Sequence, residues 1–389
     1  MNPPAALVRS EHAARSAIQH ELGELFGART NVAQTYGENF VRLWALASER
    51  ILGGKLVRPL LLVATYEALR QAQSIALRPF EGASNPREDG CDQATVIRIA
   101  SAIEVLHYSF LLHDDVIDGD LTRRGRLNLI GALLDEAGST RNTAYRGPFG
   151  DDDSTRANLH WARTGGILMG DLLLSSAHQT FARVCLPTAT RIQLLDVLDH
   201  TVTESVAGEQ LDVGLSGGMI APDLETVLTM STYKTATYTF ELPLRAAAIL
   251  AGADALLESA LAAAGRHLGL AFQLQDDLLS TFGDPRQHGK DSFSDLREGK
   301  QTALIAYARK TDHWIDIEPI FGRRNLSLAD GARLRELLVA CGAEQFVRLL
   351  IDEQLSSFFQ ILDADPTQIP NHVRCVLVDL ASQLEGRAS

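Results

Sequence analysis

The 389-residue sequence predicts an all-α protein, folded as a single large helical bundle around a central cavity. Long segments carry apolar residues at three- and four-residue spacing with abundant Ala and Leu, whereas the alternating pattern of strands is scarce. Two of the segments end in paired aspartates, Asp114-Asp115 and Asp276-Asp277. Because an unpaired buried carboxylate is costly, these pairs indicate an apolar cavity with a mouth that collects divalent cations.

The helices are expected in order along the chain. From Met1 to Phe26 the sequence is charged and helix-like, without the apolar core of a signal peptide. A glycine-rich turn at 53–59 leads into a further helix, with Pro59 near its first turn. The clearest periodicity predicts helices at 93–118, 160–183, 189–214, 222–239, 254–282, 328–340 and 342–362.

No segment divides the chain, so we expect one domain over residues 1–389. The stretches 78–92 and 136–158 are loop-like and rich in turn-forming residues. Neither separates segments that look independently foldable. Both are therefore expected to be surface insertions.

Composition excludes several function classes. The formal charge of −13 argues against a nucleic-acid binder, which needs a basic face. Charged residues interrupt the most apolar stretch, 242–264, so no transmembrane segment is expected. The four cysteines show no CxxC spacing and are expected to be reduced thiols. These features predict a cytoplasmic protein.

The first acidic motif has the spacing of a metal site. Asp114 and Asp118 share one helix face, and Asp115 is turned about 100° away. Such carboxylates suit Mg²⁺, which combines a few of them with water and phosphate oxygens. A solvated helix end would look the same, but His107 lies on nearly the same face and Arg123-Arg124 follow. Acids and arginines together can hold a metal-bridged anion from both sides.

Other basic residues stand in positions suited to phosphate. In the segment from Gly53 to Pro59, backbone N–H groups with Lys55 and Arg58 can cradle a phosphate, although an ordinary helix start is equally compatible. Lys234-Thr235 lies within a helical stretch and is weak evidence alone. After the second aspartate pair, Lys290 and Lys300 read as parts of a charged loop leading into the next helix.

Taken in order, these motifs resemble the trans-isoprenyl diphosphate synthases. The matching elements are Gly-Gly-Lys-x-x-Arg-Pro, His before Asp-Asp-x-x-Asp, Arg-Arg-Gly, Lys-Thr, Phe-Gln-x-x-Asp-Asp, Gly-Lys and Asp-x-x-x-x-Lys. The resemblance covers residues 50–305 and leaves out the ends and the 136–158 stretch. It implies the isoprenoid synthase type of helical bundle and a homodimer, although the sequence shows no interface.

The resemblance further implies two diphosphate sites. Isopentenyl diphosphate would be held by Lys55, Arg58, His107 and Arg124. Three Mg²⁺ ions, for which Mn²⁺ can substitute, would grip the allylic diphosphate from Asp114, Asp118 and Asp276. Positive charge around that group would come from Arg123, Lys234, Lys290 and Lys300. Thr235 and Gln273 would lie near the reacting carbons. Asp115 and Asp277 would lie behind the metal ligands.

The implied reaction explains this set of residues. The C–O bond of the allylic diphosphate breaks to give a carbocation, and pyrophosphate leaves only if its growing charge is stabilised. The isopentenyl double bond then attacks the cation, and loss of a proton restores an alkene. The resemblance assigns that proton to the departing pyrophosphate, so no separate His or Glu base is expected. Water must be excluded because it would quench the cation.

Two features bear on rate and product. Ser280 stands where the family usually has a third acid in its second motif, and a hydroxyl is a poorer magnesium ligand, so a modest effect is expected. The resemblance also assigns chain length to the residues four and five places before Asp114, which are Phe110 and Ser109. One bulky and one small residue favour the twenty-carbon product, geranylgeranyl diphosphate. Farnesyl or longer polyprenyl diphosphates are the alternatives.

Three other functions fit parts of the pattern. A class I terpene cyclase needs no second diphosphate site, so Lys55, Arg58 and Arg124 argue against it. A non-catalytic subunit of a heteromeric synthase tends to lose acids from these motifs, and both aspartate pairs are intact. A purely structural bundle gives no reason for the ordered set of motifs. We therefore expect an active prenyltransferase.

Overall fold

The computed structural model describes residues 5–52, 54–76, 91–123, 125–140, 154–283, 293–364 and 368–385. Most of these residues are helical, and the strands among them form a short antiparallel hairpin of β1 (Thr122–Arg123) and β2 (Arg126–Leu127). The predicted all-α fold is confirmed. The chain divides into two compact units. Unit 1 comprises residues 1–63 and 91–191, and unit 2 comprises residues 64–90 and 192–389.

Two of the three boundaries between the units fall within helices, α3 (Val57–Ala76) and α7 (Thr188–Ser216), and the third, between residues 90 and 91, lies at the edge of a described segment. The expectation of a single domain stays a prediction. Unit 1 contains the first aspartate motif and the turn before α3, and unit 2 contains the second motif. Each unit is therefore described by itself.

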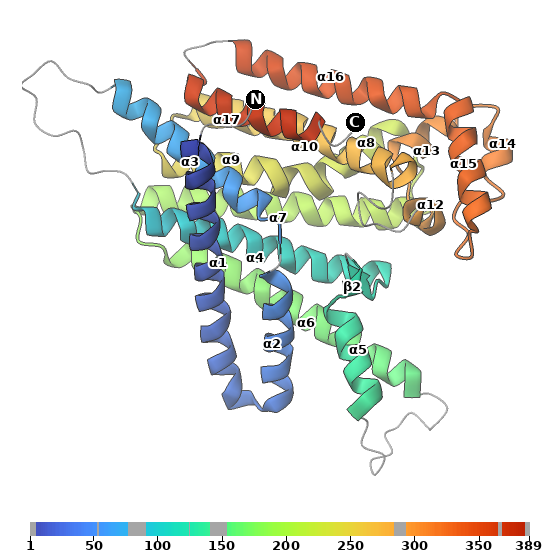
Figure 1. Ribbon diagram of the computed structural model, residues 1–389, viewed down its shortest axis with the longest axis horizontal. Coiled ribbons are helices and arrows are strands. Elements are labelled where there is room, and N and C mark those ends of the chain that lie inside the picture. The colour runs from blue at the N-terminus through green and yellow to red at the C-terminus, as the bar shows by residue number, and fades with distance from the viewer. Residues whose placement is uncertain are drawn as a thin grey trace, which may run out of the picture. The chain divides into compact units, whose positions relative to one another are not determined.

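Unit 1 is organised around α4 (Gln93–Asp118), which packs along α6 (Ser154–Arg183) (Figure 1). Helix α1 (Ala5–Ala33) contacts both α4 and α2 (Glu38–Ile51), and the 3₁₀ turn η1 (Gln34–Tyr36) joins α1 to α2. Helix α5 (Leu129–Thr140) packs against α6. All of these contacts bury apolar side chains, as the periodicity of the sequence predicts.

The ends of α4 explain where its acids stand. Asp92 accepts the backbone N–H of Thr95 at 2.8 Å and caps the start of the helix. Gly119, in the left-handed conformation, ends the helix directly after Asp118. The acidic motif therefore occupies the last turn, where the negative end of the helix dipole attracts cations.

Helix α4 is also long and apolar enough, by length and composition alone, to cross a membrane. However, 78% of its most apolar window is buried inside the structure, against α1 and α6 among others. Such burial is typical of a core helix, so this is weak evidence for a membrane span.

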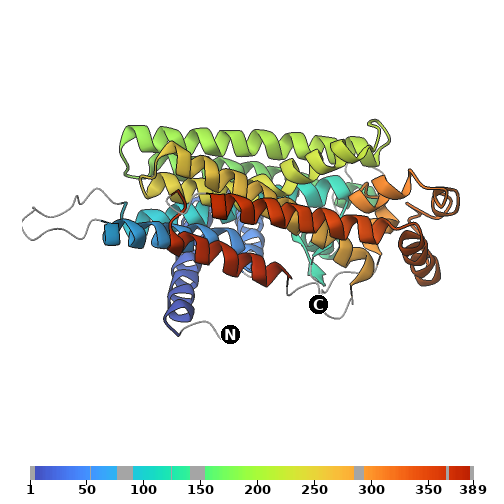
Figure 2. The same cartoon turned by 90° about the horizontal axis from the view of Figure 1, so that it is seen from above.

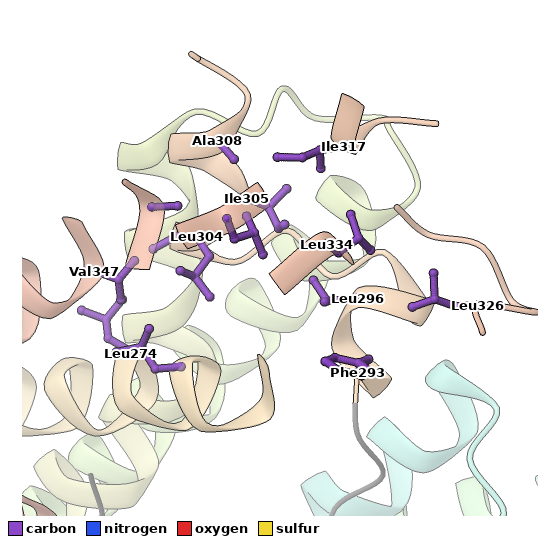
Figure 3. Close-up of a cluster of buried hydrophobic side chains, with 14 of the residues drawn as sticks. Leu274, Phe293, Leu296, Leu304, Ile305, Ala308, Ile317, Leu326, Leu334 and Val347 are labelled. Atoms are coloured by element: carbon purple, nitrogen blue, oxygen red, sulfur yellow. The ribbon is translucent and has the colours of Figure 1, made fainter. Parts of the chain in front are cut away.

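Unit 2 is organised around α10 (Ala255–Phe282), which contacts α16 (Ala343–Ala364) and the π-helix η3 (Thr232–Glu241). Figure 2 shows α16 lying along α10. The other described helices that lie wholly within this unit are α8 (Leu224–Ser231), α9 (Leu242–Leu250), α12 (Ser294–Glu298), α13 (Ala303–Ala308), α14 (Trp314–Ile317), α15 (Leu328–Ala340) and α17 (Asn371–Glu385). An apolar cluster joins α10, α13 and α16 through Leu274, Leu304 and Val347 (Figure 3).

Most of the predicted helices lie where periodicity placed them. The ranges 93–118 and 328–340 match α4 and α15, and the other predicted ends mostly differ by a few residues. The helix predicted at 222–239 is wrong as a single α-helix, because it changes to π-helical hydrogen bonding at Thr232. Among the described helices, α2, α5, α9, α12, α13, α14 and α17 had no predicted range.

The two predicted insertions lie largely outside the described residues, at 77–90 and 141–153. The prediction of loop was wrong at both ends of the 136–158 stretch, since residues 136–140 belong to α5 and residues 154–158 belong to α6. Its role as a surface insertion stays a prediction.

Candidate active site

The three acids of the first motif differ in exposure. The Asp114 side chain is 23% exposed, Asp118 is exposed, and the Asp115 side chain is only 3% exposed. Asp114 and Asp118 stand four residues apart on the last turn of α4 and so share a face. Two carboxylates are thus accessible to a cation, and the third is packed into the protein.

Arg123 of the β-hairpin binds two of these acids. Its guanidinium donates to Asp114 Oδ2 at 3.1 Å and to Asp115 Oδ1 at 2.7 and 3.1 Å. Burial raises the pKa of Asp115 to about 6, against the opposing attraction of Arg123. Burial alone would lower the pKa of Arg123, but the two carboxylates outweigh it and raise that pKa. The hairpin therefore places the positively charged guanidinium of Arg123 directly beside the acidic turn.

The donor set of this turn fits Mg²⁺. Carboxylate oxygens on one helix face, with open surface beside them, leave room for the water and phosphate oxygens that this ion prefers. The C-terminal end of α4 adds a favourable dipole. Asp114 and Asp118 would supply the oxygens, because both keep exposed surface, whereas the Asp115 side chain is only 3% exposed.

The predicted phosphate cradle is a tightly shaped turn at the start of α3. Leu56 has a positive φ of 57° and is only 2% exposed. For a residue with a side chain, this backbone conformation costs of order 1–3 kcal/mol. Its carbonyl accepts the N–H of Leu60 at 3.1 Å, so Leu56 begins the helix. The Lys55 side chain is exposed, and its carbonyl accepts a hydrogen bond from Arg15 of α1 at 3.1 Å. Lys55 therefore stands at a helix N-terminus, which favours anions.

A buried glutamate lies against this turn. Glu104 of α4 is 5% exposed, and a Cβ on residue 54 would lie 2.9 Å from its Oε1 atom. His107, partly exposed, follows three residues later on the same helix. Arg58, also partly exposed, lies in the first turn of α3. Unit 1 thus contains the described residues predicted to bind isopentenyl diphosphate.

The two residues expected to set chain length have different surroundings. Ser109 is fully buried, and its hydroxyl donates to the Gly170 carbonyl of α6 at 2.9 Å. A Cβ on residue 170 would lie 2.3 Å from the His113 ring, so the two helices approach closely here. Phe110 keeps part of its surface exposed. Of the pair, Phe110 is the residue that keeps exposed surface.

In unit 2, the second acidic motif lies near the end of α10. Asp276 is partly exposed, while Asp277 is 7% exposed and accepts the Gln273 amide at 2.8 Å. The Ser280 hydroxyl donates to the Asp277 carbonyl at 2.9 Å and is turned into its own helix. Asp276 is therefore the acid of this motif with surface to offer a cation.

Lys234 and Thr235 lie on the π-helix η3. The Lys234 ammonium group contacts Glu209 Oε2 at 2.9 Å and Asp212 Oδ2 at 2.6 Å, both on α7. Gly208 makes this approach possible, because a Cβ there would lie 2.3 Å from the Lys234 backbone nitrogen. Thr235 is partly exposed. A π-helix often marks a functional position, because its wider turn re-aims side chains.

The structure gives less information on the surroundings of the remaining predicted basic residues. Lys300 follows α12, and its ammonium group lies 3.3 Å from Glu298 on the surface of unit 2. Arg124 and Lys290 lie outside the described residues.

A second acidic group of unit 2 is already neutralised. His200, Glu204 and Glu241 place ligand atoms within 4.8 Å of one another. Arg266 lies between the two glutamates, with nitrogen atoms 2.9 Å from Glu204 and 2.6 Å from Glu241. Because a guanidinium already occupies the position of a cation, this group is an internal ion network.

Sequence reasoning missed three acids that contact predicted site residues: Glu104, Glu209 and Asp212. Glu104 carried a usable signal, since it is a lone charge within an apolar helical run. The other two stand on a helix with mixed polarity and gave no such signal.

Comparison with known proteins places this chain in a family. The family model described as polyprenyl synthetase matches residues 42–338, which is more of the chain than the 50–305 expected from the motifs. Geranylfarnesyl diphosphate synthase of Natronomonas pharaonis is 30% identical over 336 residues, 86% of this chain and 87% of that protein. Geranylgeranyl diphosphate synthase of Methanosarcina mazei is 27% identical over 298 residues, 77% and 76% of the two chains.

Among solved structures, geranylgeranyl pyrophosphate synthase from Corynebacterium glutamicum is similar over most of the chain. It was crystallised with isoprenyl diphosphate and magnesium, is 28% identical, and superposes with a TM-score of 0.81 over 96% of this chain and 98% of that one. The ordered motifs, the helical fold and these similarities agree, and the chain belongs to the polyprenyl synthetase family as a trans-prenyl diphosphate synthase.

Proposed function

We propose that this enzyme condenses isopentenyl diphosphate with an allylic diphosphate to make all-trans geranylgeranyl diphosphate. The observation that carries the product length is the position of Phe110, partly exposed one helical turn before Asp114. A bulky residue there would stop a growing chain that smaller residues would let pass. The alternatives are farnesyl diphosphate and longer products, and relatives named for twenty- and twenty-five-carbon products leave the length to experiment.

The allylic diphosphate site is built from acids and bases together. We assign Mg²⁺ binding to Asp114, Asp118 and Asp276, with three ions per active site and Mn²⁺ as a substitute. When bound, the metal ions supply positive charge that stabilises the departing pyrophosphate. Asp115 and Asp277 act behind these ligands, since each is buried and bound to a neighbouring side chain. The basic residues assigned to this diphosphate are Arg123, Lys234, Lys290 and Lys300.

Isopentenyl diphosphate is assigned to the turn before α3 and to α4. Lys55, at the helix N-terminus, and Arg58 supply charge, and His107 and Arg124 complete the site. Thr235 and Gln273 are assigned positions near the reacting carbons.

The chemical step follows from this division. Cations around the allylic diphosphate favour breaking its C–O bond, which leaves an allylic cation and pyrophosphate. The double bond of the isopentenyl group forms the new C–C bond to that cation. The proton then lost passes to pyrophosphate, so the residues of the chain orient both substrates and keep water out.

We further propose that the enzyme is a cytoplasmic homodimer. Helix α6 exposes Trp161, Ile167 and Leu168, with 54%, 44% and 52% of each residue accessible. Trp161 and Leu168 are seven residues apart and form a stripe on one helix face, and Ile167 is turned about 100° from Leu168 at its side. Large apolar side chains gathered on one face are typical of a surface that a partner covers.

Product analysis tests the proposal. Isopentenyl diphosphate with a five-, ten- or fifteen-carbon allylic primer and Mg²⁺ is expected to give the twenty-carbon diphosphate, resolved by chromatography after dephosphorylation. Excess EDTA is expected to abolish turnover, and added Mg²⁺ or Mn²⁺ to restore it. Undiminished condensation in EDTA would exclude the metal mechanism, and a main product of another length would exclude the geranylgeranyl assignment.

A further inference from the structure

We propose that Glu104 is a positioning residue that holds the Gly54–Arg58 turn in shape for isopentenyl diphosphate. The inference rests on the proposed assignment of that turn to this substrate. Glu104 would act through the turn without touching the substrate itself.

The first observation is that a buried acid, Glu104, lies beside a proposed site for an anion. A buried carboxylate beside an anion site opposes binding of the anion, because the charges repel more strongly at low dielectric. Glu104 nevertheless lies against Gly54 and is 5% exposed. The presence of a carboxylate here is explained if it fixes the position of the Gly54–Arg58 turn, whose groups are assigned to bind the diphosphate.

The second observation is the shape of the turn. Leu56 adopts a left-handed backbone, with a φ of 57°, that a residue with a side chain rarely takes. Such a conformation persists only where surrounding contacts hold it. Three features hold this turn: the burial of Leu56, the hydrogen bond from Arg15 to the Lys55 carbonyl, and the contact of Glu104 with Gly54.

The third observation is the place of Glu104 on α4. It lies three residues before His107, so one helix carries both a predicted substrate ligand and the residue that contacts the turn. Gly54 is matched to it, because a Cβ at 2.9 Å from Oε1 would force the carboxylate or the turn to move. Glu104 therefore sets the turn, and with it Lys55, relative to His107.

The test separates the KM values of the two substrates. Glu104→Gln keeps the size of the side chain and removes its charge, and is expected to raise the KM for isopentenyl diphosphate about tenfold. The KM for the allylic substrate is expected to stay within about twofold, because the turn is assigned to the other diphosphate. Glu241→Gln is the matched control, since Glu241 is equally buried but lies on η3. It is expected to leave the ratio of the two KM values unchanged.

A double-mutant cycle tests the contact itself. Gly54→Ala is expected to raise the same KM, and to raise it much less in a Glu104→Ala background, where the carboxylate no longer obstructs the added methyl group. If the Glu104 variants do not fold, Gly54→Ala carries the test, because it disturbs the same contact from the side of the turn and is expected to raise the KM for isopentenyl diphosphate alone. Additive effects, or equal increases in both KM values, would overturn the inference.

Lys55→Ala distinguishes this inference from the function on which it rests. If Lys55→Ala raises the KM for isopentenyl diphosphate and Glu104→Gln does not, the positioning role of Glu104 is wrong and the substrate assignment stands. If Lys55→Ala leaves that KM unchanged, the assignment of the turn itself is wrong.

Discussion

Asp115 differs from its neighbours in the first motif because its carboxyl is packed into the protein and bound by Arg123. Its pKa of about 6 lies above the value of about 3.9 expected in the unfolded chain. The folded state therefore binds the proton more tightly than the unfolded state. The stability that this difference contributes is present below about pH 4 and lost as the pH rises towards 6.

Asp115→Asn is expected to remove this pH dependence. In metal-free buffer, the free energy of unfolding of the parent enzyme should fall relative to the variant by about 2–3 kcal/mol between pH 4 and 7, from about 1.4 kcal/mol per pKa unit. Urea unfolding at several pH values measures the difference. Parallel curves for the two proteins would show that Asp115 titrates normally.

Phe110 is the residue at which product length is expected to change. Phe110→Ala should lengthen the main product beyond twenty carbons, because the side chain has open surface one turn before Asp114. Ser109→Ala is the control, since it removes only the hydroxyl that bonds to Gly170 and should leave the product unchanged. Product chromatography beside a melting curve measures both. A lowered Tm with unchanged product would show that Phe110 only packs between helices.

Ser109→Phe is expected to shift the main product towards fifteen carbons and to lower the stability of the enzyme. Ser109 is fully buried against α6, so a phenyl ring there must displace backbone as well as fill space.

At the scale of elements, the approach of η3 to α7 determines the position of the Lys234 side chain. Lys234 reaches Glu209 and Asp212 because the π-helix comes close to α7 at Gly208. The lysine charge is held by two carboxylates on the neighbouring helix, and its position depends on the spacing of the two backbones. The contact between η3 and α7 thus aims a residue assigned to the diphosphate.

Gly208→Ala is expected to move η3 and lower kcat by about 10², because small misplacements of charged groups are costly in catalysis. The added Cβ would stand 2.3 Å from the Lys234 backbone nitrogen. Gly27→Ala is the matched control, since a Cβ there meets nothing within 4 Å and should stabilise α1 by about 1 kcal/mol. Unchanged kcat in Gly208→Ala would mean that the position of Lys234 does not limit the reaction.

At the scale of the whole molecule, the exposed apolar stripe of α6 predicts association. Light scattering after size-exclusion chromatography is expected to give twice the 42.3 kDa of one chain. Leu168→Glu should shift the mass to that of one chain, because a charge in an apolar interface is costly. Leu349→Glu, on the exposed surface of α16, is the control and should not change the mass. A parent enzyme of 42.3 kDa would exclude the homodimer.

Most of the fold was predictable because helices are specified locally. Each turn of α4, α10 and α15 repeats an apolar face within a few residues, so periodicity alone located them. The aspartate pairs were recognisable for the same reason, as acids at the polar ends of apolar helices. Ordered motifs then pointed to the polyprenyl synthetase family before any geometry was known.

The state of each charged group was decided by tertiary packing. Asp114 and Asp115 are adjacent, chemically identical and both bound by Arg123, yet one is accessible and the other buried, because α4 turns different faces to solvent and to the interior of unit 1. The close approach of Gly208 to Lys234 and the contact of Glu104 with Gly54 join residues far apart in the chain. Burial, pairing and pKa depend on such distant neighbours, whereas helix formation depends on near ones.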